Sequence, residues 1–148
     1  MEKFKALSSV TLFLVRKRNG KTEVLLQKRK GSVMLSGMWD GSASGHVEAT
    51  ESMTQCVIRE AREELGVEIR REDIVHTVLQ HSRYADVVYY NGYFFVKDYR
   101  GTPKIGEPEK CAEIAWYAVD ALPETFLKNK AQAVGAFMEG VAYVEYGW

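Results

Sequence analysis

The stretch that decides the fold is Gly45-His-Val-Glu-Ala-Thr-Glu51-Ser-Met-Thr-Gln-Cys-Val-Ile-Arg59-Glu60-Ala-Arg-Glu63-Glu64-Leu-Gly66-Val67. Within it, Ser52 and Gln55 have the spacing of a capping box, which marks the start of a helix. Apolar side chains then recur at helical spacing, and Gly66 supplies a C-terminal stop. The sequence therefore predicts a helix over residues 52–65.

Acidic side chains crowd one side of this predicted helix. At 100° per residue, Glu60, Glu63 and Glu64 fall within about 100° of one another. Like charges at this spacing destabilise a helix, and Arg59 can neutralise only one of the three carboxylates. A hard divalent cation would neutralise the others, because Mg²⁺ prefers carboxylate oxygens, waters and substrate phosphates. A solvated helix face has the same charge pattern, so the residues alone leave both interpretations open.

Composition limits the classes of protein to which the chain can belong. The 148 residues are 46% hydrophobic and 27% charged, which predicts one globular domain over residues 1–148 and excludes disorder. Lys and Arg total 20 and balance 20 Asp and Glu, so no net field attracts polynucleotides or acidic membranes. No apolar run approaches the length that spans a bilayer. Cys56 and Cys111 lack a metal-ligand spacing, which favours buried reduced thiols and a cytoplasmic location.

Strand-like segments flank the predicted helix. An Asn19-Gly20 turn predicts a β-hairpin, and residues 31–45, rich in glycine and serine, predict a long loop or short strands. A second helix is expected to close the domain over residues 123–139. The sequence thus predicts a mixed α/β domain. The predicted strands are residues 6–15, 23–27, 73–80, 86–97 (with a bulge at Gly92) and 114–119.

The segment 45–67 matches the Nudix box position for position. The pattern is Gly, five residues, Glu, seven residues, Arg-Glu, an aliphatic, any residue, Glu-Glu, any residue, Gly and an aliphatic. The chain therefore resembles the Nudix hydrolase superfamily, although Thr50 replaces the usual glycine before Glu51. This resemblance implies the Nudix fold, a mixed β-sheet sandwiched between α-helices. It also implies hydrolysis of a nucleoside diphosphate linked to another group, with Mg²⁺ or Mn²⁺ as cofactor.

The resemblance also assigns roles to residues of the box. The metal ligands would be Glu60, Glu63, Glu64 and the backbone carbonyl of Gly45. Arg59 would orient the carboxylates through ion pairs, and Glu51 would anchor the loop before the helix.

The general base is left open by the resemblance. It is either a helix carboxylate, Glu60 in the nearest family pattern, or a metal-facing glutamate from the later loop. In that loop Glu109 is the first choice and Glu113 the second, although exposed glutamates without a role would look the same.

The segment Glu107-Pro-Glu-Lys-Cys with Trp116 through Leu-Pro123 resembles nucleoside-triphosphate pyrophosphohydrolases related to the antimutator enzymes. A small nucleotide, NTP or dNTP, is therefore the expected substrate, cleaved to the monophosphate and pyrophosphate. Arg29 resembles a family arginine that contacts phosphate, though an exposed strand-end cation fits equally well. Trp39 and Tyr84, like Trp116, could stack on a base, or they could fill the core.

Other activities remain as alternatives. Tyr84 lies 17 positions after the box, where dinucleoside-polyphosphate hydrolases of the family carry a tyrosine. Residues 25–46 also resemble isopentenyl-diphosphate isomerase, although residues 42–44 lack the cysteine that this enzyme needs. A non-catalytic nucleotide-sensing module is a further alternative, and signatures for ADP-ribose, coenzyme A and NADH are absent. His46 and His81 are most simply packing residues, and the sequence leaves a homodimer open.

Overall fold

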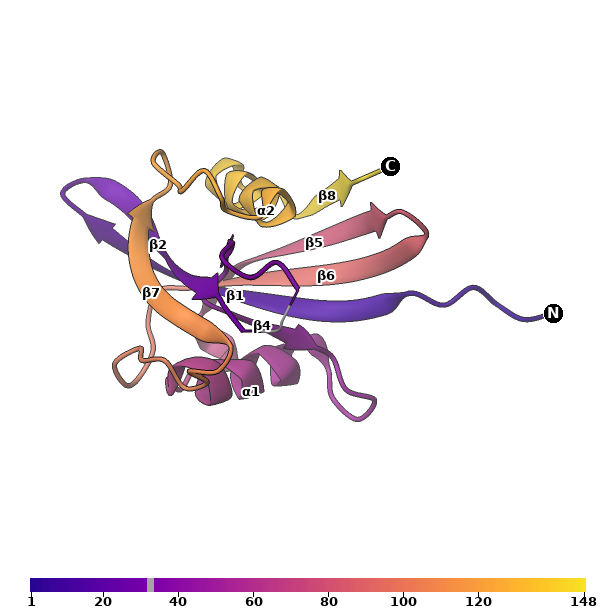
Figure 1. Cartoon of the computed structure of the whole chain (residues 1–148), viewed down its shortest axis with the longest axis horizontal. Coiled ribbons are helices and arrows are strands. Elements are labelled where there is room, and N and C mark those ends of the chain that lie inside the picture. The colour runs from indigo at the N-terminus through magenta and orange to yellow at the C-terminus, as the bar shows by residue number, and fades with distance from the viewer. Residues whose placement is uncertain (32–33) are drawn as a thin grey trace.

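Strand β1 (Leu7–Arg18) runs through the centre of the structure and separates two hydrophobic cores. We describe a computed structural model of the chain, covering residues 1–31 and 34–148. Because side chains alternate along a strand, Val10 and Leu12 pack toward α1 (Met53–Leu65), whereas Phe13 and Val15 pack toward α2 (Lys128–Glu139). The two helices therefore cover opposite faces of the sheet (Figure 1).

The sheet is mixed, and β1 bonds to different partners along its length. Its residues 7–14 pair in parallel with β6, residues 9–12 also pair antiparallel with β4, and its last four residues form a hairpin with β2. The strand order is β3-β2-β1-β6-β5-β8, with β4 also on β1 and β7 also on β2. Among the described residues, no helix is both long and apolar enough to cross a lipid bilayer. The remaining elements are β2 (Lys21–Arg29), β3 (Trp39–Asp40), β4 (Ala43–His46), the short 3₁₀ helix Arg71–Asp73, β5 (Ile74–Tyr84), β6 (Val87–Val96), β7 (Cys111–Ala118) and β8 (Tyr143–Tyr146).

The local signals in the sequence are confirmed where they were strongest. Asn19 and Gly20 both have positive φ, as a two-residue hairpin turn requires. In α1 the Ser52 hydroxyl accepts from the backbone N–H of Gln55, the Gln55 side chain accepts from that of Ser52, and Gly66 ends the helix in the left-handed region. Cys56, like Cys111, is a buried free thiol. The mixed α/β class and the sandwich of helices around the sheet are therefore confirmed, and residues 31–45 carry only the short strands β3 and β4, with residues 32–33 outside the described part.

Three details of the predicted elements are wrong. The second helix begins at Lys128, because Pro123–Leu127 instead bonds through its backbone to Trp39. The chain does not close with this helix, since β8 follows and pairs in parallel with β5. Gly92 lies in regular register, and the irregularity falls between Ile74 and His76 of β5. A Cβ at Gly92 would press on the Met53 sulfur, so close packing against α1 explains that glycine.

The capping box of α1 gives a first prediction. Replacing Ser52 by Ala removes an acceptor for an otherwise unpaired N–H of the first turn, which costs about 1 kcal/mol. For a protein of this size, that loss lowers the melting temperature by about 2–4 °C. Calorimetry should show this fall. The control is Thr102→Ala, at an exposed position whose hydroxyl makes no hydrogen bond within the described residues, and its melting temperature should not change. An equal fall in both variants would contradict the role of Ser52 as the helix cap.

Candidate functional site

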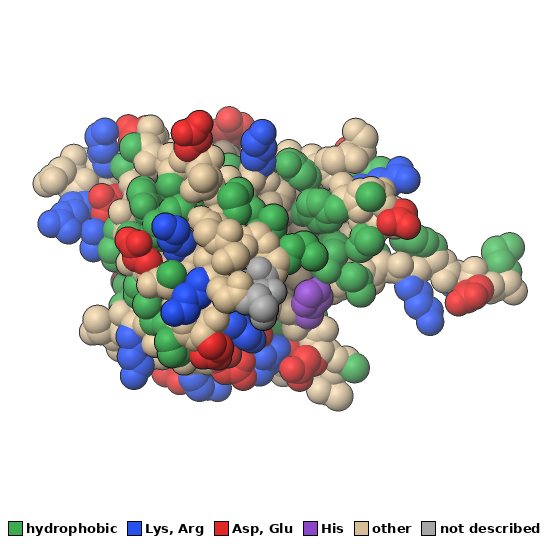
Figure 2. Space-filling model, in the orientation of Figure 1, with side chains coloured by type: hydrophobic (Ala, Val, Ile, Leu, Met, Phe, Trp, Pro, Cys, Tyr) green, Lys and Arg blue, Asp and Glu red, His purple; other side chains and the backbone are tan. Residues whose placement is uncertain are grey.

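Arg59, in the middle of α1, donates hydrogen bonds to two carboxylates of the helix and to one of the loop before it. Its Nε and Nη2 donate to the two oxygens of Glu51 at 3.1 and 2.7 Å. Its Nη1 donates both to Glu60 Oε1 at 2.8 Å and to Glu63 Oε2 at 3.2 Å. In Figure 2, acidic and basic side chains are intermixed along the lower edge of the molecule, where Figure 1 places α1. One guanidinium thus orients three carboxylates.

The other side of the helix places Glu60 and Glu64 against the sheet. Glu60 is only 9% exposed, and a Cβ on Gly45 of β4 would overlap its carboxylate, so glycine permits this close approach. Glu64 accepts from Gln27 Nε2 at 3.0 Å and from the backbone N–H of Ser44 at 3.2 Å. Burial, together with a hydrogen bond that protonated Glu64 donates to neighbouring Glu60, raises the pKa of Glu64 far above its ordinary value. The carboxyl groups of Glu60 and Glu64 are therefore neighbours in partly desolvated surroundings, where an ionised carboxylate needs a positive charge close by.

Glu60 and Glu63 converge on the Arg59 guanidinium, whose Nη1 lies within 2.8 and 3.2 Å of their oxygens. Among the described residues, no group of three His, Cys, Asp or Glu side chains is gathered closely enough to hold a metal ion. The donor set nonetheless fits a hard divalent cation, since it offers carboxylate oxygens and a backbone carbonyl at Gly45. The side chain of Glu63 is 49% exposed, so it has room to turn.

The loop between β6 and β7 docks on the C-terminal end of α1. Lys104 N–H donates to Leu65 O at 3.0 Å, and Gly106 N–H donates to Glu64 O at 2.9 Å. A Cβ on Gly106 would overlap the last turn of the helix. The loop therefore satisfies carbonyls that a helix end leaves unpaired.

Glu109 and Glu113, the sequence-predicted carboxylates of this region, are both exposed. Glu109 lies in the turn before β7, and its backbone carbonyl approaches Gly31. Glu113 lies on β7 opposite Lys28. The structure brings neither carboxylate into the hydrogen-bonded cluster around Arg59.

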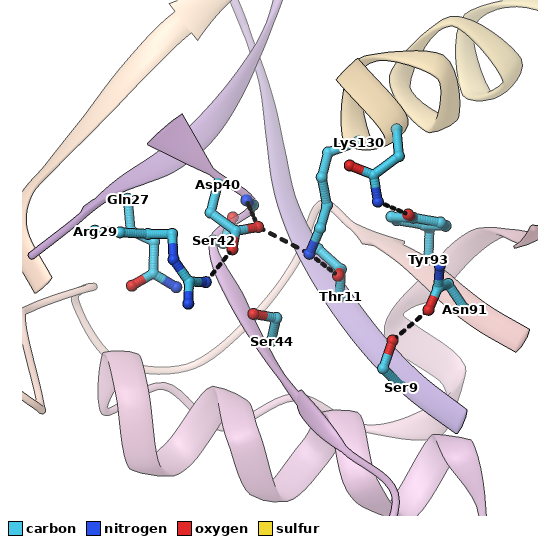
Figure 3. Close-up of polar contacts among 12 residues, drawn as sticks. Ser9, Thr11, Gln27, Arg29, Asp40, Ser42, Ser44, Asn91, Tyr93 and Lys130 are labelled. Atoms are coloured by element: carbon cyan, nitrogen blue, oxygen red, sulfur yellow. Dashed lines mark hydrogen bonds and ion pairs between the residues drawn. The ribbon is translucent and has the colours of Figure 1, made fainter. Parts of the chain in front are cut away.

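The three residues predicted to contact substrate lie in different environments. Arg29 donates to Asp40 Oδ2 at 2.7 Å and to the Met34 carbonyl at 2.9 Å, so its guanidinium is engaged (Figure 3). Trp39 is only 6% exposed and meets Tyr117 edge to face at 5.1 Å. This placement favours the core alternative for Trp39.

His46 lies at the end of β4, and His81 and Tyr84 lie near the C-terminal end of β5. Tyr84 is 38% exposed, and its hydroxyl accepts from Asn129 at 2.7 Å. His46 hydrogen-bonds the Tyr89 hydroxyl at 3.0 Å, and His81 stacks on Tyr90 with ring centres 4.6 Å apart. Both histidines therefore have packing partners, as expected.

Several polar residues at the site escaped the sequence-based prediction. Gln27 and Ser44 hold Glu64, and Asp40 bonds Lys130 as well as Arg29. Asp40 and Lys130 are 90 positions apart in the chain, and no periodicity links positions so far apart. The resemblance of residues 25–46 to an isomerase was the one sequence signal that included Asp40.

Comparisons with known proteins identify the family and the fold. A family model described as NUDIX domain matches residues 7–137. An NAD-capped RNA hydrolase NudC of Stutzerimonas stutzeri is 32% identical over 83 residues, which cover 54% of this chain and 27% of that protein. Isopentenyl-diphosphate Delta-isomerase 1 of Photorhabdus laumondii is 36% identical over 73 residues, covering 48% of this chain and 42% of that protein. The solution structure of the E. coli ORF135 protein superposes with a TM-score of 0.71 at 27% identity, covering 91% of this chain and 90% of that one.

The pairing of Glu51 with Arg59 predicts a pH dependence. Hydrogen bonds from Arg59 and from the backbone N–H of Glu48 lower the pKa of Glu51 from 4.5 to about 2. Between these values the unfolded chain binds more protons than the folded one, so the stability due to Glu51 is present above pH 4.5 and is lost as the pH falls toward 2. Glu51→Gln should therefore be less stable than the parent at pH 7, and the gap should narrow at pH 3.

Urea unfolding at pH 7, 4 and 3 measures this gap. The control is Glu124→Gln, at an exposed glutamate without an ion pair among the described residues, for which a near-constant difference is expected. A Glu51→Gln gap that stays as wide at pH 3 as at pH 7 would contradict the pairing.

Proposed function

Because the chain belongs to the NUDIX domain family, we propose that it is a Mg²⁺-dependent hydrolase of the pyrophosphate bond in a nucleoside diphosphate derivative. The most specific form of the proposal is conversion of an NTP or dNTP to the monophosphate and pyrophosphate. The observation that carries it is the packing of the α1 glutamates: Glu60 and Glu63 share Arg59, Glu60 lies against the Gly45 backbone, and Glu64 accepts from Ser44 of the same strand. Mn²⁺ has similar ligand preferences and is an alternative cofactor.

The proposed metal ligands are Glu60, Glu63, Glu64 and the carbonyl of Gly45, with Glu109 as a ligand from the later loop. A bound divalent ion would neutralise charge on the phosphate chain and lower the pKa of a water molecule. Arg59 would orient the carboxylates of Glu51 and Glu60 through the ion pairs that it already makes, while Glu63, half exposed, would turn from its pair with Arg59 toward the ion.

The proton of the attacking water needs an acceptor close to the phosphorus atom. Glu60 is the first choice within α1, because it is buried and its carboxylate faces the Gly45 backbone. Glu109 is the alternative, and its exposed turn leaves the side chain room to move toward a bound phosphate chain. Ser44 N–H and Gln27 hold Glu64 in place while the proton moves.

Substrate selection is proposed from residues outside the Nudix box. The segment 107–123 resembles nucleoside-triphosphate pyrophosphohydrolases, and Tyr84 presents an exposed ring at the rim of the sheet. Arg29, which is paired with Asp40, and Trp39, which packs on Tyr117, complete the proposed substrate-binding set. The similarity to an NAD-capped RNA hydrolase spans 27% of that protein, so dinucleotides and dinucleoside polyphosphates belong among the compounds tested.

The similarity to an isopentenyl-diphosphate isomerase covers a comparable length. Positions 42–44 of this chain are Ser-Ala-Ser, and the two cysteines lie elsewhere, in α1 and at the start of β7. A thiol at the position that the isomerase resemblance requires is therefore missing. This observation favours hydrolysis over isomerisation.

Product analysis tests the proposed reaction. The purified chain is incubated with Mg²⁺ and separately with NTPs, dNTPs, dinucleoside polyphosphates, NAD and isopentenyl diphosphate. We expect nucleoside monophosphate and pyrophosphate from at least one triphosphate, and no reaction after chelation of the metal. Release of orthophosphate alone, or isomerisation without hydrolysis, would overturn the proposal.

Replacing Glu63 or Glu64 by Gln tests the proposed ligands. Each change removes one anionic oxygen donor and should lower kcat by at least about 100-fold, while circular dichroism shows an unchanged fold. Glu139→Gln, at an exposed glutamate on α2, is the matched control and should keep the parental rate. Parental turnover in both Glu63→Gln and Glu64→Gln would refute the metal assignment.

Glu109→Gln tests the role of the later loop. If this carboxylate assists water attack, kcat should fall at least about tenfold with a modest change in KM. Steady-state kinetics on Glu109→Gln and Glu113→Gln side by side measure this. A loss confined to Glu113→Gln would move the role to that residue, and parental rates in both would remove the loop from the mechanism.

A further inference from the structure

Asp40 is a buried carboxylate that bonds two cations from distant parts of the chain. Its side chain is 1% exposed, with Oδ2 at 2.7 Å from Arg29 Nη1 at the end of β2 and Oδ1 at 2.8 Å from Lys130 Nζ in the first turn of α2. The N–H of Gly41 donates to Oδ1 at 2.6 Å. Burial alone would raise the pKa of Asp40, but Lys130 and then Arg29 hold it below its usual value. The side chain is therefore anionic and joins three elements (Figure 3).

Such a buried cluster contributes more to geometry than to stability. Desolvating the charges costs about as much as their attraction returns, whereas displacing any partner leaves a charge uncompensated. Asp40 thus fixes where β3 lies relative to β2 and α2.

The chain that follows Asp40 is held by hydrogen bonds to β1 and β2. Ser42 is fully buried, and its N–H donates to Leu12 O at 2.8 Å. Its hydroxyl donates to Leu25 O at 2.6 Å and accepts from the N–H of Leu14 at 2.9 Å. A change in the position of Asp40 is therefore passed along the backbone toward β4.

Strand β4 carries the backbone groups that meet the glutamates of α1. The N–H of Ser44 donates to Glu64, and Ser44 pairs in register with Thr11 of β1. Lys130 Nζ donates to the Thr11 hydroxyl at 2.7 Å as well as bonding Asp40. The Lys130 ammonium group therefore contacts both Asp40 and Thr11, the β1 residue that pairs with Ser44.

We propose that Asp40 is a positioning residue for the metal site, because its bonds to Lys130 and Arg29 fix the backbone of Ser44 and Gly45 against the α1 carboxylates. The inference rests on the proposed function, which assigns a divalent ion to those carboxylates. Asp40 itself contacts neither the ion nor the substrate.

Asp40→Asn tests the proposal, because it keeps the shape of the side chain and removes its charge. Mn²⁺ affinity, measured without nucleotide by electron paramagnetic resonance, should fall about tenfold or more. The Mg²⁺ concentration needed for half-maximal turnover should rise by a similar factor. Asp120→Asn, which breaks the exposed pair with Lys21 at 3.0 Å, is the matched control and should leave both values unchanged.

Lys130→Met is the second variant, since Arg29 still neutralises Asp40 there. Its Mn²⁺ affinity should fall in the same direction by a smaller factor, and it decides the question if Asp40→Asn does not fold. A folded Asp40→Asn or Lys130→Met protein with parental Mn²⁺ affinity would overturn the inference, even with a lowered melting temperature. Failure of the proposed function looks different: the parent chain would bind Mn²⁺ but hydrolyse no nucleotide.

Discussion

The contact of Arg59 with Glu51, Glu60 and Glu63 is the interaction on which the rest of the site depends. Three carboxylates on one helix and its leading loop would repel one another, and Glu60 is buried as well. The guanidinium suits this task because its planar fork can bond several carboxylates in fixed directions. Its two bonds to Glu51 tie the loop to the helix, and its third nitrogen holds the two α1 carboxylates at one place.

The sheet supplies the other half of the site. Glycine at position 45 lets the backbone of β4 reach the Glu60 carboxylate, and Ser44 and Gln27 orient Glu64 from β4 and β2. Glu60 therefore lies between the Arg59 guanidinium on one side and the Gly45 backbone on the other. Burial and the neighbouring Glu60 raise the pKa of Glu64, and a divalent cation at this place would favour the ionised carboxylate.

The sequence predicted features that depend on neighbouring residues in the chain. The capping box at Ser52, the stop at Gly66 and the Asn19-Gly20 turn are local, so they were read correctly. The start of α2 was placed too early because Phe126 looks helical in pattern, yet its segment bonds to Trp39 far away in the chain. The short strand β8 was missed because a pairing with β5 decides it.

The same distinction applies to the site. The stripe of three glutamates and Arg59 follows from helical spacing, and in the structure Glu60 and Glu63 bond Arg59 while Glu64 bonds Gln27 and Ser44. The ion pairs of Asp40 with Arg29 and Lys130 depend on tertiary contacts that no local pattern encodes.

A crystal structure of the chain with Mg²⁺ and a non-hydrolysable nucleoside triphosphate tests the central claim most directly. The account predicts the ion bound by Glu60, Glu64 and the carbonyl of Gly45, with Glu63 turned from Arg59 toward the ion or its waters. An ion held elsewhere, with Glu60 and Glu63 still sharing the Arg59 guanidinium, would contradict it.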